Sequence, residues 1–250
     1  MSQLRKISLH PFFVTILLFV FFFHSSAIAQ IKGIDNHMLR TIEKYRTPKQ
    51  NTFFKFVSKI NNPVCLTGPA ALFVTGALQP NTILRKKALF GIETIATAQI
   101  ITFSLKFTIS RRRPHLFDTT FTAVVPAHNA AFPSGHTAEA FAMATAMSIA
   151  VPKWYVIVPA FAWASIMAYA RIYLGVHYPS DVVAGAIVGA GSGYLMYKLN
   201  NWLQKIDKGH HPANEVTGLF VGLGTSYLLY HMNHLIQMGK KRRPMRTPVF

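Results

Sequence analysis

The chain has 250 residues, of which 51% are hydrophobic and only 14% are charged, a composition that excludes an average soluble protein and favours a membrane protein. Lys and Arg outnumber Asp and Glu by 26 to 8, for a net charge of +18, but the basic residues form short clusters between apolar runs rather than one long stripe. Such clusters are typical of loops that face anionic lipid headgroups, so no nucleic acid is expected as a partner. The single cysteine, Cys65, excludes an intrachain disulfide.

The N-terminus has the plan of a secretory signal peptide. Two basic residues precede an apolar block at 11–23, and Ala27 and Ala29 form a small-x-small cleavage pattern. We therefore predict cleavage before Gln30, with residues 1–29 as the signal peptide. The alternative is an uncleaved first transmembrane helix, which would need residues beyond the apolar block to reach the ~20 that a span requires.

Residues 30–62 mix aromatic and basic side chains, which predicts a helical segment at the membrane surface. Apolar runs near bilayer length follow. They cover about residues 63–80, 88–105, 136–152, 154–172, 181–199 and 216–237. Gly and Ala recur within several runs, for example at 184–191, and such small residues let helices approach closely in a bilayer. The sequence therefore predicts an all-α fold, a polytopic membrane helical bundle of about six spans, with its core at 63–199 and an additional apolar helix and basic tail at 200–250.

The connections between the apolar runs differ in charge. Basic residues gather at 85–87 and 198–208, on one side of an up-and-down bundle, so this side is predicted to be cytoplasmic. The loops 106–135 and 173–180 then lie on the extracytoplasmic side, together with the mature N-terminus. If the run 216–237 also spans the membrane, the basic C-terminal tail emerges on the outer side, against the positive-inside tendency, so the span of this run is left open.

The first candidate binding motif is KFTISRRRP, Lys106 to Pro114. If the helix continues to Arg113, Lys106 and Arg113 stand two turns apart on one face, so both cations reach one ligand. Arg111 and Arg112 then point elsewhere, and we expect them to snorkel to headgroups.

The second motif is Pro133-Ser134-Gly135-His136. It suits a helix start at which Gly135 lets the backbone approach a ligand closely and the free first-turn N–H groups bind an anion, with His136 at the mouth of that site. A plain N-cap explains Ser134 equally well but does not account for the histidine. Glu139, one turn further on, is a candidate to tune His136 or to shape a headgroup pocket.

The third motif lies in ARIYLGVHYPSD, residues 170–181, which places three ionisable side chains between two apolar runs. Arg171 is permanently cationic, His177 can act as a nucleophile or proton carrier, and Asp181 can fix the tautomer of an imidazole. A membrane-surface loop would also explain this stretch taken alone. The other two motifs favour a phosphate-handling site.

Taken in order, the three motifs resemble the tripartite signature of the type 2 phosphatidic acid phosphatase superfamily, which includes lipid phosphatases, class A acid phosphatases and vanadium haloperoxidases. The matching elements are Lys106-x6-Arg113-Pro114, Pro133-Ser134-Gly135-His136 and Arg171-x5-His177-x3-Asp181, and the resemblance covers about residues 52–199. One position departs, because the family usually has serine where this chain has Ala170. The resemblance implies an all-helical bundle and a phosphohistidine mechanism that needs no metal and no cofactor.

The resemblance also implies a role for each matching residue. The phosphate-binding set is Lys106, Arg113, Ser134, Gly135 and Arg171, and the catalytic set is His177, His136 and Asp181. His177 attacks phosphorus while Asp181 orients its other nitrogen, and His136 protonates the departing oxygen and later activates water. The fixed cations stabilise the charge of the transferred group.

The sequence therefore predicts a multi-pass phosphatase of the inner membrane, with its active site facing the periplasm or the outside. The expected substrate is a phosphomonoester or pyrophosphate of a lipid: polyprenyl pyrophosphate, a lipid A phosphate, phosphatidylglycerol phosphate or phosphatidate. Membrane lipids are expected partners, and no obligatory protein partner is predicted. A secreted soluble acid phosphatase and a non-catalytic phosphate-lipid binder or transporter are the alternatives, the second disfavoured because binding alone needs no nucleophile.

Overall fold

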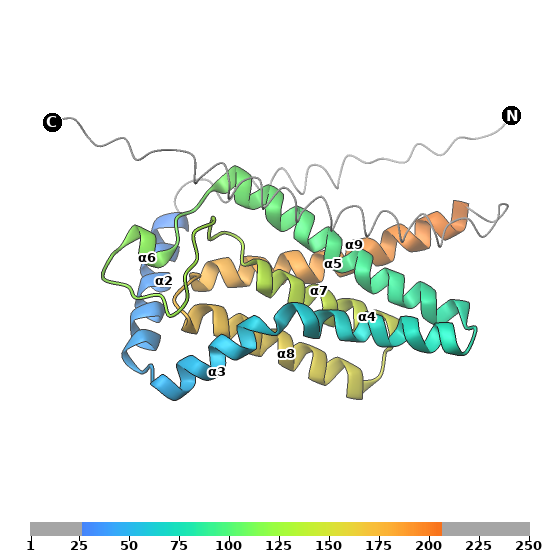
Figure 1. Ribbon diagram of the computed structural model, residues 1–250. Coiled ribbons are helices and arrows are strands. Elements are labelled where there is room, and N and C mark those ends of the chain that lie inside the picture. The colour runs from blue at the N-terminus through green and yellow to red at the C-terminus, as the bar shows by residue number, and fades with distance from the viewer. Residues whose placement is uncertain (1–26, 207–250) are drawn as a thin grey trace, which may run out of the picture.

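The computed structural model describes residues 27–206, the coloured part of Figure 1. Over these residues the chain forms helices and no strands, which confirms the all-α prediction for the described part. The helices are α2 (Ala27–Lys44), α3 (Pro48–Lys59), α4 (Asn61–Leu78), α5 (Thr82–Ile109), α6 (Pro114–Phe117), α7 (Gly135–Ala150), α8 (Trp154–Tyr173) and α9 (Pro179–Ile206). The apolar block of the predicted signal peptide and the run 216–237 lie outside the described residues, so both stay predictions.

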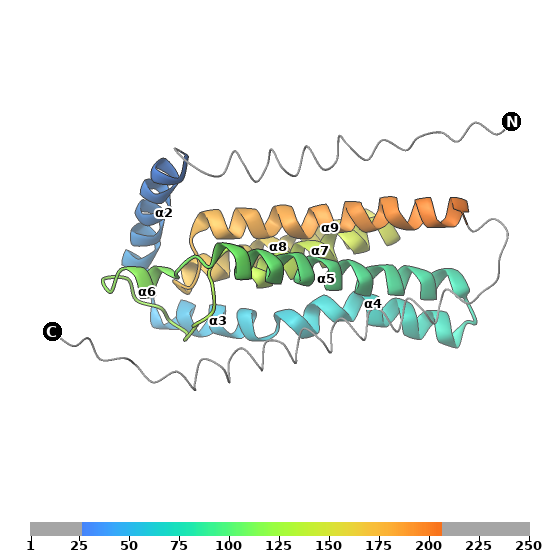
Figure 2. The same cartoon turned by 90° about the horizontal axis from the view of Figure 1, so that it is seen from above.

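Five helices lie side by side along a common direction: α4, α5, α7, α8 and α9 (Figures 1 and 2). Helix α7 occupies the centre, because it packs against each of the other four. Helix α2 runs across one end of this bundle, and α6 lies at the same end (Figure 2). All five apolar runs predicted within the described residues are therefore helices of the bundle.

The packing of α7 against α9 depends on glycine. A Cβ added to Gly185 would lie 2.6 Å from the carbonyl oxygen of Ser134, and one added to Gly189 would lie 2.3 Å from the carbonyl oxygen of Ala138. Real Cβ atoms do not approach backbone so closely, so the two helices meet backbone to backbone at these positions. This is the close approach that the small residues of 184–191 predicted.

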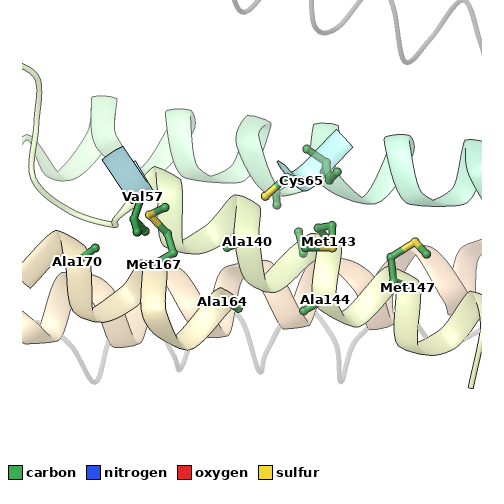
Figure 3. Close-up of a cluster of buried hydrophobic side chains, with 12 residues drawn as sticks. Val57, Cys65, Ala140, Met143, Ala144, Met147, Ala164, Met167 and Ala170 are labelled. Atoms are coloured by element: carbon green, nitrogen blue, oxygen red, sulfur yellow. The ribbon is translucent and has the colours of Figure 1, made fainter. Parts of the chain in front are cut away.

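The centre of the bundle is filled by small and flexible side chains. Figure 3 shows this cluster, which joins α3, α4, α5, α7 and α8. Its labelled members are Val57, Cys65, Ala140, Met143, Ala144, Met147, Ala164, Met167 and Ala170. Alanines bring the helices close together, and methionines fill the irregular gaps that remain between them.

Within residues 27–206, three segments are long and apolar enough to cross a membrane: Thr82–Phe117, Trp154–Tyr173 and Pro179–Trp202. Large hydrophobic side chains on these segments are exposed, among them Phe107, Trp154 and Val183. An apolar surface of this kind suits contact with lipid tails. The chain is therefore a membrane protein, whereas the predicted count of about six spans goes beyond these three segments and stays a prediction.

Candidate active site

The three predicted motifs meet at the end of the bundle where α5 and α8 finish and α7 and α9 begin (Figure 1). Polar and charged side chains are buried here, namely Arg113, Ser134, Arg171, His177 and Asp181. Lys106 and His136 are half-buried beside them. Buried charges are costly unless they are paired, so the contacts among these groups define the site.

Arg113 and Lys106 approach the loop that precedes α7. The Nε of Arg113 donates to the carbonyl oxygen of Asn129 at 2.9 Å, and one terminal nitrogen donates to the side-chain oxygen of the same residue. Lys106 Nζ, in the last turn of α5, donates to the carbonyl oxygen of Ala130 at 2.6 Å. Both cations therefore approach the loop 129–130, while their binding of one ligand stays a prediction, and Asn129 is a further residue here that the motifs did not reveal.

Arg113 reaches the site by a different route from the predicted one. Helix α5 ends at Ile109, and Ser110 follows in a left-handed conformation with φ of 47°. The Ser110 hydroxyl donates to carbonyl oxygens of the preceding turn, which competes with continuation of the helix. Arg113 is extended, because it precedes Pro114, which begins α6. The prediction that one helix continues to Arg113 is wrong, and a non-helical turn delivers this side chain instead.

The start of α7 lies where the second motif predicted it. Helix α7 begins at Gly135, and the buried Ser134 Oγ lies 2.9 Å from Oγ1 of Thr137 rather than capping a backbone N–H. A Cβ added to Gly135 would make ordinary contacts, at 3.6 Å from Thr102 and 4.0 Å from Lys106. The surrounding protein therefore has room for a side chain at this position. The predicted reason for glycine, approach of a ligand to the backbone, stays a prediction.

His136 follows Gly135 in the first turn of α7, within electrostatic range of Arg171, Arg113 and Lys106. A group placed among three cations is well situated to meet an anionic ligand. Glu139, one turn further along, accepts hydrogen bonds from Asn61 at 3.1 Å and Gln99 at 3.4 Å. Those contacts place the carboxyl group in a polar cluster inside the bundle.

His177 is completely enclosed between α8 and α9. Its Nε2 lies 3.2 Å from a terminal nitrogen of Arg113. A guanidinium group can only donate, so this contact assigns the lone pair to Nε2 and the hydrogen to Nδ1, which faces Asp181 Oδ2 at 3.6 Å. Burial, and then the charges of Arg113 and Arg171, hold the pKa of His177 well below its usual range. The imidazole is therefore neutral, as a nucleophile must be.

The backbone before His177 is fixed by a glycine. Gly175 has a φ of 71°, which is left-handed, and a Cβ there would lie 2.6 Å from the carbonyl oxygen of Thr122. Only glycine fits both the conformation and the space. Gly175 therefore fixes the path of the loop that presents His177.

Asp181 is held on both carboxylate oxygens. Its Oδ2 accepts the backbone N–H of Tyr178 at 2.9 Å, and its Oδ1 accepts a hydrogen bond from Arg111 at 2.7 Å. Arg111 also pairs with Asp35 of α2 at 2.8 Å. The prediction that Arg111 points away to headgroups is wrong, because two buried carboxylates attract it into the site. Arg112, by contrast, is exposed.

Arg171 lies in the last turn of α8 with only 6% of its surface exposed. One terminal nitrogen donates to the hydroxyl oxygen of Ser58 on α3 at 2.5 Å, while its Nε has no hydrogen-bond partner within the described residues. A buried donor of this kind is available to a ligand. Ala170, the position that departs from the family pattern, packs in the apolar cluster of Figure 3.

This fold and site define a class of protein: a helical membrane protein in which several buried cations and a neutral histidine gather at one end of the bundle. A family model described as the PAP2 superfamily matches residues 87–205. The crystal structure of LpxE from Aquifex aeolicus superposes with a TM-score of 0.53 at 30% identity, over 65% of this chain and 93% of that one. The chain belongs to the PAP2 superfamily, which confirms the predicted resemblance.

Two curated relatives add detail. A lipid A 4'-phosphatase from Bacteroides thetaiotaomicron is 42% identical over 66 residues, which are 26% of this chain and 29% of the relative. The undecaprenyl-diphosphatase BcrC from Bacillus subtilis is 29% identical over 126 residues, 50% of this chain and 63% of that protein. The chain thus matches less than two thirds of the length of either relative.

Proposed function

We propose that this protein is a metal-independent membrane phosphatase that hydrolyses a phosphomonoester or pyrophosphate of a lipid through a phosphohistidine on His177. One observation carries the proposal: the buried, neutral imidazole of His177 has Nε2 beside Arg113 and Nδ1 facing Asp181. A phosphate held by Arg113 comes within reach of the Nε2 lone pair. This arrangement supplies a nucleophile that mere binding does not need.

The phosphate group is bound by cations from three elements: Lys106 of α5, Arg113 of the following turn and Arg171 of α8. Transfer of a phosphoryl group passes through a transition state whose charge is spread over its peripheral oxygens, so fixed cations in a buried site provide most of the stabilisation. Ser134 and the N–H groups of the first turn of α7 add neutral donors to the same anion.

Each chemical step then has a named group. The Nε2 lone pair of His177 forms a bond to phosphorus as the bond from phosphorus to the leaving oxygen breaks, and the protonated form of His136 gives that oxygen a proton and becomes neutral. Asp181 stabilises the positive charge that develops on the His177 ring. In the second step His136 takes a proton from water, the hydroxyl oxygen attacks phosphorus, and the bond to Nε2 breaks. Phosphate is released and both histidines regain their starting states.

A lipid substrate is favoured by the surroundings of the site. The helices that carry the motifs expose apolar side chains, so a lipid tail can stay in the bilayer while its headgroup enters. Exposed hydrophobic residues also occur on α2 and α3 beside the site, such as Ile34 and Phe56, which supports the predicted interfacial position of these helices. The relatives' names point to lipid A phosphate and polyprenyl pyrophosphate as the first substrates to test. A soluble acid phosphatase would not need this apolar surface.

We further propose that the site faces the periplasm or the outside of an inner-membrane protein. A cysteine at the exposed Thr119, in the loop beside the site, should react with a membrane-impermeant thiol reagent in intact spheroplasts, in a background where Cys65 is alanine. A cysteine at the exposed Lys86, at the opposite end of the bundle, should react only after the membrane is permeabilised. The reverse pattern would place the site in the cytoplasm.

The activity itself is tested by phosphate release from a panel of purified lipids by the detergent-solubilised protein, in buffer with a metal chelator. The panel contains undecaprenyl pyrophosphate, lipid A, phosphatidylglycerol phosphate and phosphatidate, and His177→Ala is the matched inactive control. We expect release from at least one lipid that is absent in the control. Release from none of them would contradict the proposed function.

A further inference from the structure

We propose that Arg111 and Asp35 are positioning residues for the reaction: they fix Asp181, and through it His177, and so make helix α2 part of the active site. The proposal rests on the function proposed above. It assigns a role to Arg111, which lies between Lys106 and Arg113 in the first motif, and to Asp35, which lies 76 residues before Arg111 in the sequence.

The contacts form one continuous chain of charged groups. Arg111 donates from one terminal nitrogen to Asp181 Oδ1 at 2.7 Å and from the other to Asp35 Oδ2 at 2.8 Å. Its guanidinium lies over the ring of Tyr178, 4.0 Å from the centroid. Both aspartates are at most 1% exposed, and Arg111 pairs with both, so it compensates two buried negative charges.

Asp35 also holds the beginning of α9. Its Oδ1 accepts the backbone N–H of Ser180 at 2.9 Å, and its Oδ2 accepts the Ser180 hydroxyl at 2.5 Å. Asp181 is the next residue in the chain. Helix α2 therefore binds the first turn of α9 from one side while Arg111 binds it from the other.

These contacts leave the Asp181 carboxylate little freedom. Because Oδ1 is bound by Arg111 and Oδ2 by the N–H of Tyr178, the group cannot rotate, and Oδ2 stays opposite Nδ1 of His177. A carboxylate in this place favours the hydrogen on Nδ1 and the lone pair on Nε2, the atom that attacks phosphorus. Without Arg111 the carboxylate can turn away, and the fraction of His177 in the reactive tautomer falls.

The chain offers matched controls for this proposal. Arg112 is adjacent in sequence but exposed, so Arg112→Gln removes a charge from the same turn without touching Asp181. Arg40 of α2 pairs with Asp118 at 3.2 Å, so Arg40→Gln removes a contact that holds α2 against the loop but leaves Asp35 in place. Together they separate the positioning of Asp181 from general effects of charge and of α2 docking.

The test compares Arg111→Gln, Arg111→Lys and Asp35→Asn with these two controls. For each variant we would measure kcat and KM on the lipid that the wild type hydrolyses fastest, the Kd of vanadate, and the melting temperature. For Arg111→Gln we expect kcat to fall by about 10²-fold, the order of effect of a misplaced reacting group, with KM and the vanadate Kd changed less than about 3-fold. Arg111→Lys should recover part of kcat, Asp35→Asn should lower it less, and both controls should match the wild type.

A second readout does not depend on turnover. The ¹⁵N shifts of the His177 ring should show hydrogen on Nδ1 in the wild type and in Arg112→Gln, and a mixture of tautomers in Arg111→Gln. If Arg111→Gln keeps wild-type kcat and the wild-type tautomer, or lowers kcat only in proportion to lost folded protein, the positioning role is wrong. If the wild type hydrolyses no lipid, the proposed function fails, and the tautomer of folded Arg111→Gln still decides the positioning role.

Discussion

The middle of the bundle and the end that carries the site are built by different means. In the middle, α7 packs against its neighbours mainly through alanine, glycine and methionine, with Glu139, which is hydrogen-bonded to Asn61 and Gln99, as a polar exception. At the site, charged side chains from α2, the turn after α5, α8 and α9 are held by hydrogen bonds between segments far apart in the sequence. The first region depends on how well its side chains fill the space between the helices, so substitutions there should reduce folding. The second region depends on where its charged groups are placed, so substitutions there should reduce catalytic activity while the protein stays folded.

The largest effect is expected at the nucleophile. His177→Ala should lower turnover of the lipid substrate by more than about 10⁴-fold, because no other group of the site can form the covalent intermediate. Vanadate should still bind, since Lys106, Arg113 and Arg171 remain, and the melting temperature should stay near that of the wild type. Equilibrium binding with matched thermal unfolding checks both statements. Retention of substantial lipid hydrolysis would contradict the role of His177.

Replacement of His136 should reduce activity in a different way. His136→Ala removes only the proton donor, so hydrolysis of a lipid phosphate should fall by about 10² to 10⁴-fold, the usual contribution of general acid catalysis. An aryl phosphate has a leaving oxygen that hardly needs a proton, so its rate should recover in part. The ratio of the two rates, measured for His136→Ala and His177→Ala in parallel, separates the roles. Rescue of His177→Ala in place of His136→Ala would exchange the two assignments.

A smaller effect is expected at Asn129, which orients Arg113 through its side-chain oxygen. Loss of one hydrogen bond to a charged group costs about 1.5 kcal/mol or more, so Asn129→Ala should weaken vanadate binding by about 10-fold. The neighbouring His128 is exposed, and His128→Ala should leave the Kd unchanged. Equal Kd values for Asn129→Ala and the wild type would show that Arg113 is held without this contact.

The smallest effect on chemistry is expected in the middle of the bundle. Gly189→Ala inserts a methyl group against the backbone of α7 and should reduce stability by about 1–3 kcal/mol, while kcat of the folded fraction is unchanged. Gly191→Ala is the matched control, because nothing lies within 4 Å of its added Cβ. Thermal unfolding and active-site titration with vanadate check the pair. A fall in kcat per folded molecule would contradict the separation of the two regions.

These two regions also differ in how well the sequence predicts them. The apolar runs predicted α4, α5, α7, α8 and α9, because a helix buried along its length appears in the sequence as a run of consecutive apolar residues. The motif residues of the site were found because their spacing is local within each motif. The end of α5 was not predicted. The Ser110 hydroxyl and the extended backbone of Arg113 end the helix within a stretch whose sequence otherwise favours a helix.

Arg111 was assigned to the membrane surface for a related reason. Its partners, Asp35 and Asp181, lie 76 and 70 residues away in the sequence. No local pattern indicates that these two buried carboxylates lie beside Arg111 in the fold. One signal was available: Asp35 is among only 8 acidic residues in the chain, so each acid is a candidate partner for a buried cation. Asn129 and Ser58 carried no such signal, because asparagine and serine are common in loops and helix surfaces.

The central claim is that phosphate is transferred to His177, and trapping the intermediate tests it most directly. The protein is mixed with a ³²P-labelled substrate that it hydrolyses, quenched in base within milliseconds, and the labelled residue is located by mass spectrometry. We predict a base-stable, acid-labile phosphohistidine at His177 that is absent in His177→Ala and accumulates in His136→Ala with an aryl phosphate. Label on His136, or turnover with no labelled histidine at any time, would contradict the account.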